Sequence, residues 1–564
     1  MTVSTRERTS QRIQSTVVAF HPAPPGKDSD TRAQRRYRLA LLLLAAVLLL
    51  PNISHTSNPG QGDEVMHIAT VQDSLASGSY LYPELNGFIN FYKPPLLFWL
   101  AMGTEKLTEQ LPMDTGLLGE RIISAMASAG AALLLFQILL VYRKPARQAF
   151  FWAALYLSSL GVLKFARLLM FEQLVAFHIM GTLYVFALWL MQRKDYWLVL
   201  LGLLVGSSYL YKGPLIPIYM ALGLLSWASM EFYRTARRFS WNLNHKAIVP
   251  VLRTGIIVSF SALLPVAAYL AYLLNHPNGD ELITYFVVFE NAAKFVDQNQ
   301  SELVLLRGIA LYLLPWTLLL GAVFYSWRKR KYNGLRTPAT QFASLMVITF
   351  LAITLFHIIP HRKADYYMLP LFGLLFVAAG LRSASPSTRA TNALVAALSL
   401  SGSMAAAYLG SYLSAAILAG LAVFAVLGAR REGGFNWKGL GPGIAFSALL
   451  PLTLFPALFP ETLNREDQAM LRNQDVCVLS ENPWSALAYR GLIKQSDMIQ
   501  RHPDLSPECD NHRFLIEHDE ANIPDGYRKV SGYPVWKDLS LDQYLADWKE
   551  PRKLQRSRNI YEKN

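Results

Sequence analysis

Long apolar runs alternate with short polar stretches along most of the chain. Many runs approach the roughly 20 residues that an α-helix needs to cross the hydrocarbon layer of a membrane. Only helices or closed barrels can cross, because lipid offers the backbone no hydrogen-bond partner. The runs lack the apolar–polar alternation of barrel strands, so the pattern predicts a polytopic α-helical membrane protein.

Basic clusters divide these runs into pairs. Lys and Arg gather on the cytoplasmic side of membrane proteins, so two apolar segments between successive clusters predict one helical hairpin. This alternation predicts about thirteen spans, with the N-terminus inside and the C-terminus outside. The first span is expected near 38–55, and the clusters are Arg32 to Arg38, Arg143 to Arg147, Arg193 and Lys194, Arg234 to Arg238, Arg328 to Lys331, Arg382 and Arg389, and Arg430 to Lys438.

The same pattern predicts three parts of the chain. Residues 1–37 are polar and basic, and are expected to form a disordered cytoplasmic tail. Residues 38–460 hold the spans, and residues 56–95 form a long first outward loop in which helices along the membrane interface are plausible. Residues 461–564 are polar and predict a small α/β domain outside the membrane. In that domain VCVLS and HRFLI are typical of short strands, and SENPWSALAYRG of a turn followed by a helix.

The two cysteines, Cys477 and Cys509, both lie in the C-terminal part. A disulfide between them suits an oxidising compartment such as a Gram-negative periplasm. Two buried free thiols are the alternative.

Composition agrees with a membrane protein. Hydrophobic residues make up 52% of the 564 residues and charged residues 16%, against about a quarter charged in a typical soluble domain. The net charge of the chain, +14, has a second possible explanation, which is binding to nucleic acid. However, the Lys and Arg residues lie mainly at the ends of apolar segments, and no basic stripe with interleaved aromatics marks a separate domain. Nucleic acid is therefore not an expected partner.

Unusual polar residues collect in the segments predicted to face outward. Lys and Arg can neutralise charge that develops on phosphate oxygens, and a carboxylate can remove the proton of an acceptor hydroxyl. Proline after Lys93, and Gly-Pro after Lys212, would stop a helix and fix each lysine at a membrane boundary. The set comprises Asp63, Glu64, Tyr92, Lys93, Lys164, Arg167, Glu172, Tyr211, Lys212, Glu290, Asn291, Lys294, His361, Arg362, Lys363, Asp365, Tyr366 and Tyr367.

Each of these residues also has a structural interpretation. Asp63 and Glu64 could begin a solvated helix, and Lys93 and Lys212 could reach toward lipid headgroups. Tyr366 and Tyr367 could belong to an interfacial aromatic belt, and Glu172 could pair with Arg167. Their conjunction on one membrane face favours a function. His67, His178, His357 and His361 lack the compact spacing of metal ligands, so no cofactor follows from them and a divalent metal stays open.

Around these residues the chain resembles a known family across residues 39–380. It is similar to the protein O-mannosyltransferase superfamily of GT-C membrane glycosyltransferases, whose bacterial branch includes the lipid A aminoarabinose transferases. The segments that carry the resemblance are GDE (62–64), SGSYLYPELNG (77–87), FYKPPLLFW (91–99), GERIISA (119–125), ARLLMFEQL (166–174), YKGPL (211–215), LLPW (313–316) and KADYYMLPL (363–371).

The resemblance implies an inverting transfer from a polyprenyl-phosphate sugar donor, in a cavity that faces the periplasm of a bacterial inner membrane. It implies that Asp63 is the general base, supported by Glu64, with Glu172 as a second catalytic acidic residue and Arg167 and Tyr92 in support. The donor phosphate would be held by Lys93, Lys212, Lys294 and Lys363, together with Tyr366 or Tyr367. The acceptor would be lipid A or another envelope glycolipid, and membrane lipids surround the protein.

Several positions depart from the pattern of the lipid A enzymes. Met66 and His67 stand where those enzymes usually have Arg and Tyr, and Tyr92 stands where they have an acidic residue. Glu172 stands in place of Asp, and Lys294 in place of Arg. The donor sugar is therefore left open. Two alternatives remain: protein O-mannosylation, and a non-enzymatic transporter or flippase of lipid-linked sugars, which would be expected to show inverted repeats and broken helices deep in the bilayer.

Overall fold

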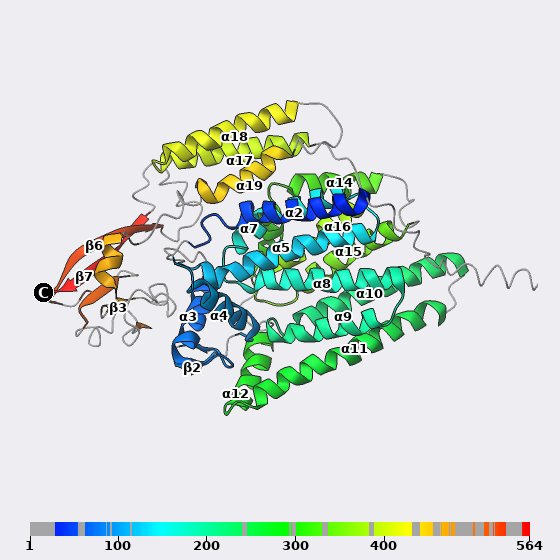
Figure 1. Ribbon diagram of the computed structural model, residues 1–564, viewed down its shortest axis with the longest axis horizontal. Helices are drawn as coiled ribbons and strands as arrows, with labels where there is room; N and C mark the ends of the chain where they lie inside the picture. The colour runs from blue at the N-terminus through cyan, green and yellow to red at the C-terminus, as the bar shows by residue number, and fades with distance from the viewer. Residues whose placement is uncertain are drawn as a thin grey trace, which may run out of the picture.

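The computed structural model shows a bundle of helices with a group of strands beyond one end (Figure 1). It describes residues 29–54, 62–85, 87–90, 93–112, 116–239, 245–292, 295, 300–329, 337–382, 388–430, 440–454, 463, 465–472, 474, 476–479, 500–501, 512–517, 523, 525–536 and 555–564.

Seven helices in the described ranges are long and apolar enough to cross a membrane. A bent pair of helices, α13 (Leu303–Tyr312) and α14 (Thr317–Lys329), meets at an angle of 103° and adds an eighth span if its halves act as one. The protein is therefore a multi-pass α-helical membrane protein. The seven are α5 (Leu118–Val141), α8 (Phe171–Gln192), α10 (Leu215–Phe239), α11 (His245–Leu274), α15 (Pro338–Phe356), α17 (Arg389–Tyr408) and α18 (Tyr412–Arg430).

Other apolar segments that were expected to span form shorter helices. Helix α2 (Ser29–Leu49) covers most of the expected first span but begins at Ser29, inside the segment expected to be a disordered tail. Arginine is a good helix former, so the basic residues before the span can continue the helix. The shorter helices are α6 (Ala146–Leu157), α7 (Leu160–Phe165), α9 (Tyr196–Ser207) with η1 (Ser208–Leu210), α16 (Phe372–Arg382), and α19 (Gly441–Leu449) with η6 (Leu450–Leu452).

Large aromatic side chains fill the centre of the bundle, where Trp152 and Trp316 are fully buried. Close backbone contact fixes α13 against the 3₁₀-helical segment η4 (Asp365–Leu371). At Gly308 of α13 an added Cβ would lie 1.8 Å from the backbone oxygen of Asp365. Only a residue without a side chain allows η4 to pack at this distance.

The first segment expected to face outward is mostly helical and lies at one end of the bundle (Figure 1). It contains α3 (Gly62–Ser77), a short antiparallel hairpin of β1 (Glu84–Leu85) and β2 (Phe88–Ile89), and α4 (Leu96–Thr108). A later segment expected to face outward contains α12 (Gly279–Thr284) and the π-helical turn η2 (Tyr285–Ala292). These elements carry or flank several of the predicted site residues.

The C-terminal strands form a mixed sheet of five strands in the order β4-β3-β5-β7-β6. Strands β3 and β5, which are parallel, coincide with the two strands expected from VCVLS and HRFLI. The expected turn and helix at 480–491 lie outside the described residues, and so does Cys509. Cys477 is disulfide-bonded, and the chain holds one other cysteine. The elements are α21 (Arg465–Leu471), β3 (Val476–Leu479), β4 (Gln500–Arg501), β5 (Phe514–Glu517), β6 (Tyr527–Trp536) and β7 (Gln555–Lys563).

Candidate active site

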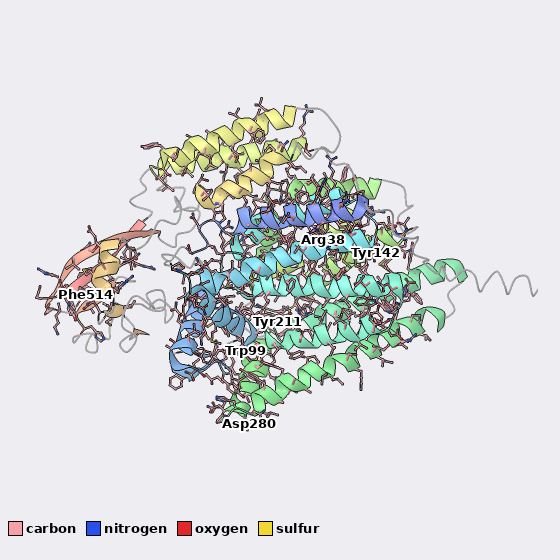
Figure 2. All side chains as sticks on the ribbon, viewed as in Figure 1. Arg38, Trp99, Tyr142, Tyr211, Asp280 and Phe514 are labelled. Carbon is pink, nitrogen blue, oxygen red and sulfur yellow. The ribbon has the colours of Figure 1, made fainter. Side chains whose placement is uncertain are left out.

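A cavity of about 740 Å³ opens among α3, α8, α10, η2, η4 and the C-terminal end of α15. Tyr211, one of its lining residues, lies toward the end of the bundle that faces the C-terminal strands, whereas Arg38 and Tyr142 lie toward the other end (Figure 2). Seven of the residues to which the family resemblance assigns a site role line this cavity: Asp63, Lys93, Glu172, Lys212, Lys363, Tyr366 and Tyr367. Tyr211 and Arg362, also in the polar set noted in the sequence, line it as well.

Two carboxylates of the lining begin helices. Asp63 lies in the first turn of α3 and is exposed, and Glu172 lies in the first turn of α8 and is buried. A helix N-terminus stabilises negative charge. Glu172 forms an ion pair with Lys212 at 3.4 Å. The expected pair with Arg167 does not form, because the Arg167 guanidinium donates to the carbonyls of Leu163, Pro51 and Leu48.

Four cations of the lining, Lys93, Lys212, Lys363 and Arg362, outnumber these two carboxylates. The Lys212 ammonium lies 5.5 Å from the centre of the Phe171 ring, a cation–π distance. The Lys363 side chain is only 1% exposed, and its ammonium donates to the Gln300 carbonyl at 3.0 Å. Arg362, in contrast, is exposed, so an anion in the cavity could reach its guanidinium more readily than the Lys363 ammonium.

Aromatic side chains form the part of the wall beside η4. Tyr366 packs against Phe165 at 5.3 Å and against Tyr367 at 5.4 Å between ring centres. Burial raises the pKa of Tyr366, and the carboxylates of Glu172 and Asp63 add to this shift. The phenol therefore stays protonated at neutral pH and can donate a hydrogen bond to an anion.

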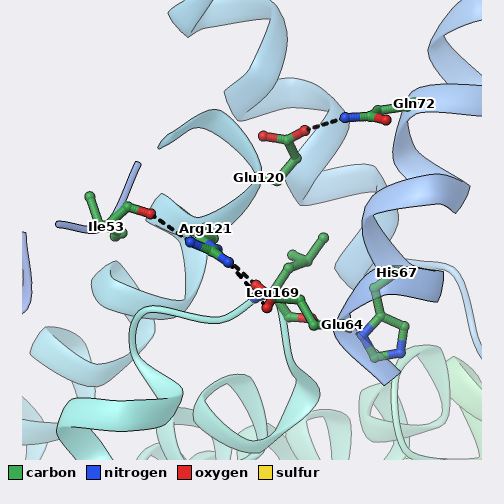
Figure 3. Close-up of polar contacts among 7 residues, drawn as sticks. All are labelled: Ile53, Glu64, His67, Gln72, Glu120, Arg121 and Leu169. Atoms are coloured by element: carbon green, nitrogen blue, oxygen red, sulfur yellow. Dashed lines mark hydrogen bonds and ion pairs between the residues drawn. The ribbon is translucent and has the colours of Figure 1, made fainter. Parts of the chain in front are cut away.

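Glu64, the neighbour of Asp63, lies outside the cavity lining. Its buried carboxylate receives two hydrogen bonds from the guanidinium of Arg121, at 2.8 and 3.2 Å, and one from the backbone N–H of Leu169 at 2.9 Å (Figure 3). Arg121 also donates to the Ile53 carbonyl at 3.1 Å. We call these four residues the buried joint, because they connect α3, α5 and the segment before α8.

Sequence reasoning missed several lining residues. His67 is buried in the cavity wall, and its spacing of four residues from Asp63 would have placed both on one helix face. Two further residues of the lining are in contact, because the Tyr219 hydroxyl and His357 Nε2 lie 2.5 Å apart. Gln300 is a further polar residue of the lining that sequence reasoning did not name, whereas Tyr211 and Arg362 belong to the polar set noted in the sequence but had no role assigned to them.

Two predicted site residues, Tyr92 and Lys294, lie outside the described residues. Within the part of the chain that the structure describes, no group of three or more His, Cys, Asp or Glu side chains could hold a metal ion. The described site thus offers carboxylates, cations and a protonated phenol around one cavity. Such a set can take up a proton and stabilise a leaving phosphate.

No protein-family model matches the sequence, but relatives do. The chain is 26% identical over 481 residues to undecaprenyl phosphate-alpha-4-amino-4-deoxy-L-arabinose arabinosyl transferase 1 of Sodalis glossinidius (strain morsitans), a match that covers 78% of this chain and 80% of the relative. It is 25% identical over 348 residues to the corresponding transferase 2 of Pseudomonas fluorescens (strain Pf0-1), covering 59% of this chain and 57% of that relative. In this second case the match spans little more than half of the relative's length.

Solved structures share the fold. The apo crystal structure of ArnT from Cupriavidus metallidurans matches with a TM-score of 0.59 and 15% identity, over 95% of this chain and 98% of that one. The structure of the same protein bound to undecaprenyl phosphate matches with a TM-score of 0.57 and 15% identity, over 93% and 97% of the two chains. This chain has the fold of ArnT and is similar in sequence to these transferases. The sequence relatives and the shared fold together agree with the family resemblance that the sequence motifs predicted.

Proposed function

We propose that this ArnT-like protein is an inverting glycosyltransferase that moves a sugar from a polyprenyl-phosphate carrier to an acceptor outside the cytoplasm. The observation that carries the proposal is the cavity, in which Asp63, Glu172 and four cations converge from segments far apart in the sequence. The names of the relatives specify an undecaprenyl-phosphate-linked aminoarabinose. They favour a pentose donor and a lipid acceptor, lipid A or another envelope glycolipid, over protein O-mannosylation and over a transporter.

In the proposed reaction an acceptor hydroxyl oxygen attacks C1 of the sugar. The bond between C1 and the phosphate oxygen breaks, and its electron pair leaves with the polyprenyl phosphate. Asp63 takes the proton of the hydroxyl, a task for which its exposed position in the cavity is suited. Glu172 is less suited, because one of its oxygens is engaged by Lys212 at 3.4 Å.

The departing phosphate would be held by cations of the lining. We assign this role to Lys93, Lys212 and Arg362, with Lys363 and Lys294 as further members and Tyr366 or Tyr367 as hydrogen-bond donors. The Lys363 ammonium contacts Gln300 and lies 3.9 Å from Glu302. Its main contribution in this proposal is therefore to fix the segment before α13 and to add positive charge.

Glu64 and Arg167 act indirectly in this proposal. The contacts of Glu64 with Arg121 and Leu169 hold the first turn of α3 against α5 and the segment before α8. Arg167 binds backbone carbonyls at the end of α2 and just after it. Both residues would therefore position Asp63 and the cavity wall, and neither would touch the substrate. For Tyr92, which precedes Lys93, we keep the supporting role.

We further propose that the cavity faces the periplasm from a bacterial inner membrane, with about thirteen spans in all. The positions of the basic clusters support this orientation. Residues 1–37 would then be cytoplasmic, residues 38–460 the transferase domain with its first periplasmic loop at 56–95, and residues 461–564 a small periplasmic α/β domain. A reporter that is active only in the cytoplasm, fused after Asn564, should give no signal, and a full signal would reverse the topology.

The reaction can be tested with purified protein in lipid nanodiscs. The donor is undecaprenyl phosphate-aminoarabinose, and the acceptor is lipid A or, in a parallel reaction, a peptide that carries Ser and Thr. Mass spectrometry should find the sugar increment on lipid A and free undecaprenyl phosphate as the second product. Transfer to the peptide alone would identify a protein glycosyltransferase. Movement of intact donor across liposomes without any transfer would identify a flippase.

A further inference from the structure

Three residues of the cavity wall carry a buried polar atom with no hydrogen-bond partner in the described chain: His67 Nε2, Tyr211 OH and Glu172 Oε2. Buried polar atoms in proteins are nearly always paired, and leaving one unpaired is costly. All three residues line the same cavity, where the centre of the Phe171 ring lies 5.1 Å from the centre of the His67 ring and 5.5 Å from the ammonium of Lys212. Lys212 in turn adjoins Tyr211 in the chain and pairs with Glu172. Unpaired polar atoms grouped in this way are complementary to a ligand rich in hydroxyl groups.

The hydrogen bond between His67 and Leu169 determines which nitrogen of the His67 ring carries the proton. Nδ1 lies 2.8 Å from the backbone oxygen of Leu169, and a carbonyl oxygen can only accept, so Nδ1 carries the hydrogen. Burial lowers the pKa of His67 to about 4, and the charges of Lys93 and Lys212 contribute to this shift. The ring is therefore neutral at pH 7 and holds one proton. Nε2 is left as a hydrogen-bond acceptor.

The orientation of the ring is fixed as well. Phe171 and Phe98 pack against it edge to face, with ring centres at 5.1 and 5.8 Å. Asp63, one helical turn earlier on α3, lines the same cavity. Nε2 thus holds one direction, on the side of the ring away from Leu169, in the wall of the cavity that also contains the carboxylate proposed to receive the acceptor proton.

We propose that Nε2 of His67 accepts a hydrogen bond from a hydroxyl group of the transferred sugar. The inference rests on the proposed function and names a specificity-determining residue for its donor. A hydroxyl supplies the missing hydrogen, whereas a sugar that carries hydrogen, methyl or acyl at that position leaves Nε2 unpaired. Because Nε2 is closed off from solvent, contact requires a side chain of the cavity wall to shift when the sugar binds.

A purely structural role for His67 makes a different prediction, and two variants separate the two roles. In His67→Asn the amide nitrogen can replace Nδ1 and still donate to the Leu169 carbonyl, but nothing replaces Nε2. In His67→Gln the longer side chain can place its amide oxygen near the position of Nε2, but the donor to Leu169 is lost. If the sugar binds Nε2, His67→Asn is the worse variant. If His67 only supports Leu169, His67→Gln is the worse variant.

The test measures equilibrium binding and transfer in nanodiscs with undecaprenyl phosphate-aminoarabinose and with two analogues that lack the 2- or the 3-hydroxyl. The parent should bind one analogue about 5- to 150-fold more weakly than the full donor. His67→Asn should bind the full donor as weakly as the parent binds that analogue, and should no longer distinguish the two. His67→Gln should regain part of the difference.

Several results would overturn the inference. The inference fails if the parent protein binds all three donors with equal affinity, a result that can be obtained even if neither variant folds. It also fails if His67→Asn binds the full donor as tightly as the parent does. The proposed function is judged separately. If the parent distinguishes the donors but transfers no sugar, the transferase proposal fails while the role of His67 stands. If the parent binds none of the donors, both fail.

Discussion

Two buried polar regions meet at one residue of this protein, Leu169. Its N–H donates to Glu64 in the buried joint, and its carbonyl accepts from His67 in the cavity wall. In the joint, the Glu64 carboxylate has three hydrogen bonds. In the wall, His67, Glu172 and Tyr211 each keep an atom without a partner in the described chain. Both regions are buried, and both contain residues from the same stretches of sequence. They differ in whether every buried polar atom has a hydrogen-bond partner.

That difference separates stability from binding. A complete buried network rigidifies the chain, and removing one member is costly. An incomplete one raises the free energy of the ligand-free protein and recovers part of it when a ligand supplies the missing partner. Substitutions in the joint should therefore change unfolding, and substitutions in the wall should change transfer.

The largest expected effect is on the rate of transfer in Asp63→Asn. The amide keeps the size of the side chain but cannot accept the proton, and loss of a general base typically costs about 10²–10⁴-fold in rate. Donor binding and the thermal unfolding midpoint should stay near the parent values, since Asp63 is exposed. Turnover near the parent value would transfer the role of the base to Glu172.

Glu64→Gln should have the opposite profile. It leaves Arg121 buried without its carboxylate, and breaking a buried ion pair costs about 3–5 kcal/mol in the free energy of unfolding. Thermal unfolding in detergent measures the loss, and the double variant Glu64→Gln with Arg121→Gln should recover part of it. If Glu64→Gln instead unfolds like the parent but transfers nothing, Glu64 belongs to the catalytic site.

Lysine substitutions compare a cavity residue with a matched residue outside it. Lys93 lines the cavity, whereas Lys164 lies outside the lining and over the ring of Phe165 at 5.2 Å. Lys93→Ala should lower the transfer rate by the equivalent of about 2.7–4 kcal/mol, by analogy with the loss of one oxyanion donor. Lys164→Ala should have little effect in the same assay. Equal, mild losses would indicate that Lys93 only reaches toward lipid headgroups.

The smallest expected effect is on the pH dependence of the unfolding midpoint, and it comes from a contact between two carboxyl groups, those of Glu105 and Glu120. Burial and the neighbouring Glu120 raise the pKa of Glu105 on α4 to about 8, above its ordinary value of 4.5. The protonated form is therefore favoured in the folded protein. Its stabilising contribution is complete below pH 4.5 and is lost as the pH rises through 8. The unfolding midpoint should fall over this interval, and less so in Glu105→Gln. Parallel curves would show that Glu105 titrates normally.

The conjunction of polar motifs predicted the Asp, Glu, Lys and Arg residues that line the cavity, but not its apolar wall or the direction of each side chain. Asp63 and Glu64 are adjacent in sequence, and adjacent residues of a helix point about 100° apart. The segment was expected to be a loop with interfacial helices of unspecified bounds, and without a helix start the two directions could not be separated. Without the start of the helix, the sequence also did not place His67 on the same helix face as Asp63. The contact between the Lys363 ammonium and the Gln300 carbonyl joins residues 63 positions apart, and no local pattern signals such a pair.

The span count shows the same limit. Hydropathy places apolar segments in the membrane but does not say whether a segment crosses as one helix. The 103° bend between α13 and α14, and the division of 146–165 into the two short helices α6 and α7, depend on packing against the rest of the bundle. The hairpin of α17 and α18 agrees with the expectation, because there each apolar run is one helix long.

The close contact at Gly308 has a consequence for genetics. A methyl group at this position would meet the Asp365 backbone at 1.8 Å, and η4 carries Tyr366 and Tyr367 into the cavity. Displacing η4 would move both tyrosines at once, although Gly308 itself is not part of the lining. A screen for loss-of-function alleles should therefore recover changes at codon 308 beside those at Asp63 and Lys93. Compensating alleles, if they arise, should map to the segment that holds η4.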